Sequence, residues 1–545
     1  QISLLSSLSF RETFHKKLSL RRHLQMANST FDIDDFQDDK VWDLICDGRT
    51  KGVFQLESQL GRSWSKRVKP RNIEELAALI SIIRPGCLKA FTEGKSMTQH
   101  YVDRKAGIDE AKYLHSSLEP ILSETYGVLV YQEQSMKIAQ QLAGFDLKEA
   151  DNLRKAIGKK KAGLMAEVKT SFLSGATDTE GLDKETAEEI FGWIEKSNRY
   201  AFNKSHAVSY AVNAYRSAYC KVHRKMRFFE SYLNHSERKP DQQVEIKELV
   251  SDAKLYDIET LPPRLGHFYP SFTAAGDNIY FGITNIKGVG TAETEKMLDL
   301  VPELEKKLGK TFAEFTWLDT LFNLGMKVNK TCMEALITVG AFNGKNNTKH
   351  RNALLYEYKS YRDLSIRERE WLSDNYNSKD SIIAAIDNMI NNLKINSNRL
   401  IKVFDVRNII ESPPFDLTDH PNWIADVENK YMGVALTFSK TDAIQSAAVN
   451  CTCREIANGR TGNVNLAIHI NSLREYATKN GKNPGQIMAF LSVEDSTATL
   501  DCAVIFPETY GKFKEVLYEG NTVVAFCQVS TKKDTSLIIN KVSQV

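Results

Sequence analysis

The chain has 545 residues, of which 42% are hydrophobic and 26% are charged, as in ordinary soluble globular proteins. One hydrophobic core does not extend over this length, so roughly three or four domains are expected. The formal net charge is only +3, which excludes a uniformly basic surface. Any affinity for nucleic acid therefore has to come from local basic faces.

The eight cysteines are scattered, and only Cys451 and Cys453 are close together in the sequence. There is no CxxC pair with a matching second pair, so the sequence predicts neither a zinc site nor a disulfide framework. This pattern is typical of a reducing cytoplasm. No apolar run is long enough to span a bilayer, so we expect a cytoplasmic protein with no membrane partner.

The first 26 residues are rich in Ser, Leu and Arg and poor in acidic residues, as in a transit peptide. The chain also opens at Gln1 with no initiator Met, which favours a piece of a longer protein.

An acidic segment follows at residues 31–47, and it has two interpretations. Asp32, Asp34 and Asp35 could hold the metal ions of two-metal phosphoryl transfer. The simpler interpretation is that they are acids at the start of a helix over residues 41–45, where the helix dipole stabilises carboxylates.

IEELAALISII at residues 73–83 predicts an apolar helix that stops at Arg84-Pro85-Gly86, because proline cannot continue it. Further on, Gly127 precedes a short apolar run and then a polar set. The set consists of Tyr131, Gln132, Glu133 and Gln134. Its glutamines could cap a helix or support a ligand site.

The most informative stretch is AFNKSHAVSYAVNAYRSAYCK at residues 201–221. Alanines at spacings of four, three and four, beginning at Ala207, predict a small-residue stripe on one helix face. The polar residues then fall at or just before the first helical turn, where free N–H groups and the helix dipole favour phosphate. These residues are Asn203, Lys204, Ser205 and His206. The competing interpretation is a short N-cap followed by an Ala-rich core helix.

Two clusters of basic residues support an anion site near the start of this helix. Residues 199–227 contain seven Lys or Arg and no Asp or Glu. LRKAIGKKK at residues 153–161 contains five cations and no acid: Arg154, Lys155, Lys159, Lys160 and Lys161. The two clusters could converge on one ligand, so we expect a polyanion as the partner.

After the LPP break at residues 261–263, a strand is predicted over residues 278–283. The sequence IKGVG then leads into a helix from Thr291. Two glycines that flank an apolar residue match the hairpin of a helix-hairpin-helix, whose N–H groups contact DNA phosphate without reading sequence. The hairpin residues are Lys287, Gly288, Val289 and Gly290. A plain helix C-cap is the alternative.

Residues 343–427 are polar and mostly helical in pattern, and we interpret them as a connector. From residue 464 the period changes to two. Five short β runs follow at 464–470, 486–493, 498–506, 522–529 and 536–541. They fit an OB-type barrel, a frequent single-strand binder, or a small sandwich.

The chain resembles the bacterial DNA polymerase III alpha subunits, the C-family polymerases, because several of its motifs match that family in sequence and in order. The matching stretches are GVFQLES (52–58), RPGCL (84–88), SETYGVLVYQEQSMKIAQ (123–140), ADNLRKAIGKKK (150–161), FNKSHAVSYA (202–211), LPP (261–263), IKGVG (286–290) and LITVGAF (336–342). The resemblance covers residues 49–345, and the five-strand tail looks like the OB domain of the family.

The resemblance implies a multidomain, mostly α fold with a helix-hairpin-helix element and a C-terminal β OB-type barrel. The implied domains are a palm-to-fingers connector (1–48), fingers (49–275), a helix-hairpin-helix region (276–345), a helical connector (346–430) and an OB fold (431–545).

It also implies DNA-directed DNA polymerase chemistry, in which positioning and charge neutralisation dominate. Arg154 and Lys155 would contact the dNTP triphosphate, with Lys159, Lys160 and Lys161 nearby. Asn203, Lys204, Ser205 and His206 would form the wall that closes on the nucleotide. Tyr131, Gln132 and Gln134 would support that wall. The implied partners are primer-template DNA, dNTP, a palm-bearing polymerase fragment, the sliding clamp and other replisome subunits.

The sequence departs from the family pattern at several positions. Lys155 stands where the family usually has a second arginine, so a bidentate phosphate contact becomes a point contact. Cys87 replaces a proline, and Ala201 replaces a glycine. Residues 345–430 contain no clamp-binding peptide of the Gln-x-x-Leu-Phe kind.

The palm of the family is also missing. Two of its catalytic aspartates lie upstream of Gln1, and counting back from Val53 places the third at Ser3, in a stretch without acids. The Mg²⁺ ligands of the complete enzyme are therefore expected outside this chain. We expect the fingers-to-OB portion of a polymerase, from a split or phage-type gene or a truncated sequence. The alternative is a non-catalytic DNA-binding replication factor.

Overall fold

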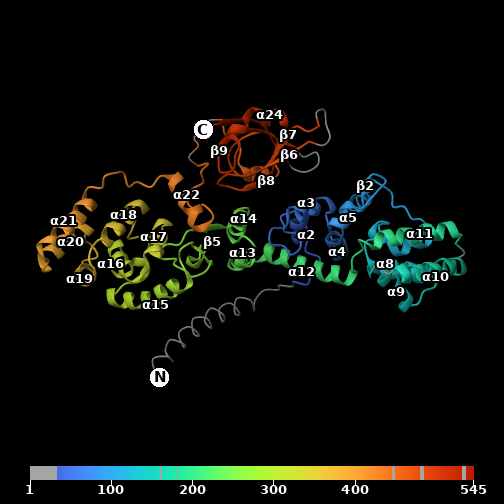
Figure 1. Ribbon diagram of the computed structural model, residues 1–545, viewed down its shortest axis with the longest axis horizontal. Helices are drawn as coiled ribbons and strands as arrows, with labels where there is room; N and C mark the ends of the chain where they lie inside the picture. The colour runs from blue at the N-terminus through green and yellow to red at the C-terminus, as the bar shows by residue number, and fades with distance from the viewer. Residues whose placement is uncertain are drawn as a thin grey trace, which may run out of the picture. The chain divides into compact units, whose positions relative to one another are not determined.

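The computed structural model describes residues 33–159, 162–180, 182–442, 444, 448–478, 484–530 and 536–544. The chain divides into two compact units, Gln1–His223 and Arg224–Val545. In Figure 1 the first unit runs from blue to green, and the second runs from green to red. Across the described ranges, none of the helices combines the length and the apolar character that crossing a membrane requires.

In its described residues, the regular structure of the first unit is helical apart from one short hairpin. Its helices are α2 (Asp39–Cys46), α3 (Gln59–Val68), α4 (Ile73–Ile82), α5 (Pro85–Lys89), α6 (Met97–Lys105), α7 (Glu119–Leu122), α8 (Gln132–Ala143), α9 (Leu147–Lys159), α10 (Ala162–Glu180), α11 (Lys184–Asn198) and α12 (Lys204–His223). The hairpin pairs β1 (Phe91–Thr92) with β2 (Lys95–Ser96), and the 3₁₀ turns are η1 (Ser116–Leu118) and η2 (Ser123–Thr125).

Helix α12 is central to this unit and packs against α4 and α2. The alanine stripe predicted on it is fully buried: Ala207, Ala211, Ala214 and Ala218. Such small side chains let neighbouring helices approach closely. Helix α4 matches the apolar helix predicted for this part of the sequence, and Asn72 caps it by accepting the N–H of Glu75. Pro85 ends that run but also begins α5, because proline is favoured in the first turn of a helix.

The acidic residues before α2 cap that helix and contact residues of α12. Asp38 caps α2 by accepting N–H groups from its first turn. Asp34 pairs with Arg216, and the backbone carbonyl of Asp35 accepts the hydroxyl of Tyr215. The described acids thus act at a helix start and on α12, whereas Asp32 lies outside the described residues.

The second unit begins with helices and a small sheet. Its helices before the barrel are α13 (Lys225–Asn234), α14 (Gln242–Lys254), α15 (Thr291–Leu308), α16 (Trp317–Lys327), α17 (Lys330–Thr338), α18 (Arg351–Arg362), α19 (Ile366–Asn375), α20 (Ile382–Asn392), α21 (Ser397–Glu411) and α22 (Pro421–Met432). The sheet has the order β3 (Glu259–Leu261), β5 (Asn278–Tyr280), β4 (Thr273–Ala275). The 3₁₀ turns are η3 (Ser236–Arg238), η4 (Ile283–Asn285) and η5 (Phe312–Glu314).

One hydrophobic core joins this helical part. It extends from Phe229 to Val434 and includes Leu354, Tyr358 and Val403. These last three belong to the polar segment that the sequence presents as a connector. That segment therefore packs into the same core as the helices before it.

The C-terminal part is a closed β-barrel, as predicted. Its elements are α23 (Cys453–Ala457), β6 (Gly462–Ala477), β7 (Ile487–Glu494), β8 (Thr499–Ile505), α24 (Pro507–Phe513), η6 (Lys514–Val516), β9 (Thr522–Ser530) and β10 (Ser536–Gln544). The strand order is β10-β8-β7-β6-β9, and only the β10–β8 pair is parallel. Each predicted β run is a strand, and closure of the sheet favours the OB-type barrel over the sandwich.

The LITVGAF motif ends α17 with a glycine that its surroundings require. Gly340 has φ +82°, and a Cβ there would lie 2.7 Å from Nε of Arg351. The Arg351 guanidinium is buried and fixed, because Nη1 lies 2.8 Å from Glu428 Oε1 and Nη2 donates to Thr437 Oγ1 at 3.0 Å. Any side chain at Gly340 would therefore disturb a buried ion pair.

We expect Gly340→Ala to lower the free energy of unfolding by about 3 kcal/mol, because left-handed backbone strain adds to the disturbed ion pair. Gly309 is the matched control, since it has φ +66° and a Cβ added there would meet nothing within 4 Å. Gly309→Ala should cost only about 1 kcal/mol. Urea unfolding followed by tryptophan fluorescence measures both, and equal losses would contradict this role of Arg351.

Candidate functional site

The segment that leads into α12, residues 200–204, is held by the RPGCL motif. A Cβ on Gly86 would lie 2.4 Å from Cδ1 of Tyr200, so only glycine allows this approach. Cys87 Sγ lies 3.9 Å from the carbonyl oxygen of Tyr200, and burial raises the pKa of this thiol to about 11. Arg84 stacks on Phe202, with Cζ 3.7 Å from the ring centroid. The motif thus fixes two aromatic positions before α12.

The same segment pairs with the YQEQ motif through the backbone. The N–H of Phe202 donates to Val130 O at 2.9 Å, and the N–H of Gln132 donates to Phe202 O at 3.0 Å. The side chain of Gln132 also donates to Ala201 O at 3.3 Å. These bonds make a short parallel bridge between Tyr131 and Phe202. Two motifs about 70 residues apart are therefore joined at the start of α12.

Gln134 supports this bridge from the interior. Its Oε1 accepts the N–H groups of Val130 and Tyr131 at 3.0 and 2.9 Å, and its Nε2 donates to Thr125 Oγ1 at 2.8 Å. Both Gln134 and Tyr131 are 2% exposed, and burial raises the pKa of the Tyr131 phenol. Gln134 is thus a cap of α8, which was one of the two interpretations of the glutamines.

Carboxylates occupy the start of α12, where the sequence predicts an anion. Asn203 accepts the N–H of His206 at 2.8 Å and donates to Glu133 Oε1 at 2.7 Å. Glu133 Oε2 accepts the N–H of Lys204 at 2.9 Å. Lys204 Nζ lies 2.8 Å from both oxygens of Glu124. The helix terminus does attract negative charge, and in this structure the charge comes from two glutamates that the sequence analysis did not assign.

An aromatic row extends from this point along α12. The ring centroid of His206 lies 5.4 Å from that of Phe202 and 3.9 Å from that of Tyr210. Tyr210 in turn contacts Phe54 of GVFQLES at 5.0 Å. His206 and its neighbour Ser205 are exposed. A fourth motif therefore reaches the exposed face of the same helix.

The LRKAIGKKK cluster lies on α9, which packs against α8, α10 and α11. Arg154 and Lys155 both pair with Asp151, at 2.7 and 2.6 Å. Hydrogen bonds from Lys155 and Arg154 lower the pKa of Asp151. Lys159 is the last residue of α9 and only its backbone is described, whereas Lys160 and Lys161 lie outside the described residues. Convergence of this cluster with Lys204 on one ligand stays a prediction.

Comparison with known proteins shows which family shares these motifs. Residues 15–180 match the bacterial DNA polymerase III alpha subunit finger domain. The chain is 34% identical over 493 residues to the DNA polymerase III subunit alpha of Aquifex aeolicus (strain VF5), which covers 89% of this chain and 37% of the relative. It is 30% identical over 511 residues to that of Staphylococcus aureus (strain MSSA476), with 93% and 43% covered. The chain belongs to the bacterial DNA polymerase III alpha subunit family. It spans about two fifths of the length of these relatives.

The IKGVG hairpin of this family member joins η4 to α15. Val289 is buried, whereas Lys287, Gly288 and Gly290 are exposed, and Gly288 has φ +93°. The N–H of Lys287 donates to Tyr431 O at 2.8 Å, and that of Val289 donates to Ile286 O. In the described part of the chain the N–H groups of Gly288 and Gly290 have no partner. This geometry suits phosphate contact, and a complete helix-hairpin-helix stays a prediction.

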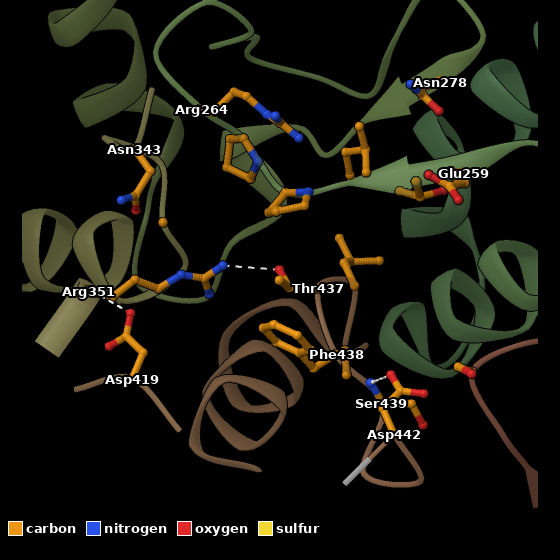
Figure 2. A pocket seen from close by; sticks show the side chains of 18 of the residues that line it. Glu259, Arg264, Asn278, Asn343, Arg351, Asp419, Thr437, Phe438, Ser439 and Asp442 are labelled. Carbon is orange, nitrogen blue, oxygen red and sulfur yellow. Dashed lines mark hydrogen bonds between the residues drawn. The ribbon is translucent and has the colours of Figure 1, made fainter. Parts of the chain in front are cut away.

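A separate cavity of about 970 Å³ lies in the second unit (Figure 2). None of the residues that the sequence predicts for the site lines it. Some of its polar groups are paired within the fold, since Asp419 accepts the N–H of Arg351 and Asp442 accepts that of Ser439. The buried Oδ1 of Asn343 has no hydrogen-bond partner among the described residues. Two of the matching motifs do line it, because LPP (261–263) and Gly340 of LITVGAF lie in its wall.

We expect Gln134→Leu to destabilise the first unit by about 2–4 kcal/mol, because the buried N–H groups of Val130 and Tyr131 would lose their acceptor. Gln141→Leu on the exposed side of the same helix is the control and should change stability by less than about 0.5 kcal/mol. Urea unfolding compares the two. A similar small effect for both would show that Gln134 does not hold the bridge.

Proposed function

We propose that this chain provides the fingers and the OB barrel of a replicative DNA polymerase. In this proposal it binds the triphosphate of the incoming dNTP and the primer-template DNA, and a palm carried elsewhere completes the enzyme. The observation that carries the proposal is the convergence of four family motifs at the start of α12. RPGCL and YQEQ hold the segment before the helix, FNKSH begins it, and GVFQLES reaches its exposed face.

The connection between α8 and α9 supports a joint phosphate site. Only residues 144–146 separate the two helices, and helices joined by so short a connection run antiparallel. The two helices have 12 and 13 residues, so in an antiparallel pair the end of α9 would lie near the level of the start of α8. The start of α8 carries Gln132, which is bonded to Phe202. The proposal therefore has the cations of α9 act toward the segment that begins α12.

The existing ion pairs do not prevent phosphate binding. The side chains of Lys204 and Glu124 are 31% and 41% exposed, and those of Arg154 and Asp151 are 40% and 31% exposed. Ion pairs this exposed contribute about 0–1 kcal/mol each. A triphosphate carries several charges, so it can replace these carboxylates as the partner of the cations.

Divalent metal ions are part of the chemistry expected of the complete enzyme, where Mg²⁺ neutralises charge on the transferred phosphoryl group. Within the described ranges, no group of three or more His, Cys, Asp or Glu side chains could hold a metal ion. The proposal assigns no metal ligand to these residues. Their role is to bind and orient the nucleotide and the DNA.

We expect Lys204→Ala and Arg154→Ala each to raise the KM for dNTP at least about tenfold in the reconstituted polymerase, because each removes a charged hydrogen bond to phosphate. Duplex affinity should change less than about twofold, since it is spread over many cations. Arg71→Ala, which removes an exposed cation paired with Asp43 outside both basic clusters, is the control. Equal losses of dNTP use and duplex affinity would mean that these residues only face DNA.

The hairpin allows an independent test of DNA binding. Gly290 has an ordinary φ of −80° and nothing within 4 Å of an added Cβ, so Gly290→Ala should fold normally. If its N–H faces a DNA phosphate, the methyl group should weaken duplex binding several-fold for every sequence. Gly511→Ala, which also adds a methyl in open space, is the control. Fluorescence anisotropy measures both, and unchanged affinity for Gly290→Ala would remove the hairpin from the DNA site.

Primer extension tests the proposal as a whole. The chain should add no nucleotides alone and should add them when mixed with a polymerase fragment that bears an Asp-x-Asp palm. Extension by the isolated chain would contradict the separate palm. Binding of primer-template DNA without extension in any mixture would favour the non-catalytic DNA-binding factor.

A further inference from the structure

Arg84 differs from the described cations that the sequence predicts for the site, and from Arg199. Lys204 pairs with Glu124, Arg154 and Lys155 pair with Asp151, and Arg199 pairs with Glu195. Arg84 has no carboxylate partner among the described residues, and its buried Nε has no hydrogen-bond acceptor there. Its guanidinium stacks on Phe202, with Cζ 3.7 Å from the ring centroid.

The sequence explains why the side chain of Arg84 points away from the turn between α4 and α5. A residue before proline is driven out of the helical conformation, and Arg84 accordingly has φ −87° and ψ 150° between α4 and α5. Its side chain therefore leaves the helix path and meets Phe202, which the bridge to Tyr131 fixes in place. A guanidinium that stacks by its face keeps its N–H edge for an acceptor, and that edge fits two oxygens of one phosphate.

The guanidinium of Arg84 lies next to residues that are proposed to bind phosphate, so a phosphate is the ligand expected for its N–H edge. Phe202 directly precedes Asn203 and Lys204, and it also contacts the His206 ring. An uncompensated guanidinium beside them adds a full positive charge, whereas the neighbouring cations must first exchange a carboxylate. Unlike Lys204, Arg154 and Lys155, Arg84 therefore gives up no ion pair when an anion binds.

We propose that Arg84 binds two oxygens of one phosphate of the nucleoside triphosphate, with Phe202 as the surface that orients its guanidinium. The inference rests on the proposed function and adds to it a residue that the sequence analysis did not assign. It also gives the RPGCL motif a chemical role: Pro85 sets the backbone of Arg84, and Gly86 admits Tyr200.

The test measures binding of dATP and of inorganic tripolyphosphate to the 545-residue chain by titration calorimetry. Arg84→Gln should weaken both about tenfold, because one charged, bidentate contact is lost. Arg84→Lys should weaken them less, since it keeps the charge but loses the planar edge. The affinity of Phe202→Leu for both probes should lie between the affinities of the wild type and of Arg84→Gln. Primer-template affinity should change less than about twofold in all three variants.

Arg71→Gln is the control, because it removes an exposed arginine of the same unit that lies outside both basic clusters and has a carboxylate partner, Asp43. Thermal unfolding confirms that each variant is folded, and Arg84→Lys carries the test if Arg84→Gln does not fold. Wild-type affinity of Arg84→Gln, with weakened binding by Lys204→Ala, would overturn this inference and leave the proposed function standing. Equal losses of dATP and DNA affinity would also overturn it. Failure of the wild-type chain to bind either probe would overturn the proposed function itself.

Discussion

The structure of the first unit depends on how five residues before and at the start of α12 are fixed. The position of residues 200–204 comes from backbone bonds to Val130 and Gln132 and from the stack and close packing of RPGCL. The buried Gln134 keeps that bridge in place by satisfying two N–H groups at once. Because these contacts come from separate parts of the chain, the exposed start of α12 keeps one geometry.

Electrostatic balance is the second constraint on the site. The chain has a net charge of only +3, and the basic clusters that the sequence shows are offset by Glu124, Glu133 and Asp151. A site of this kind holds its cations in place without a strong field of its own. An incoming phosphate then exchanges one set of oxygen partners for another, and a guanidinium without a carboxylate partner in the described chain, such as that of Arg84, favours the exchange.

Much of the fold could be predicted because it follows from local periodicity. The alanine stripe of α12, the apolar α4 and the five β runs each appear in a short window of sequence, and each is an element of the structure. The partners of the site residues could not be predicted in this way. Lys204 and Glu124 are 80 residues apart, and nothing near either residue shows that they meet. The same holds for Arg351 and Glu428, which are 77 residues apart. Their ion pair explains why position 340 requires a glycine, but only once the fold is known.

The central claim is that α9 and the start of α12 close on one triphosphate. Hydrogen exchange of the chain with primer-template DNA, measured with and without dATP, tests this most directly. The account predicts that dATP slows exchange in residues 150–159 and in residues 203–207 together, at the same nucleotide concentration. Slowing in only one of these segments, or in neither, would contradict it.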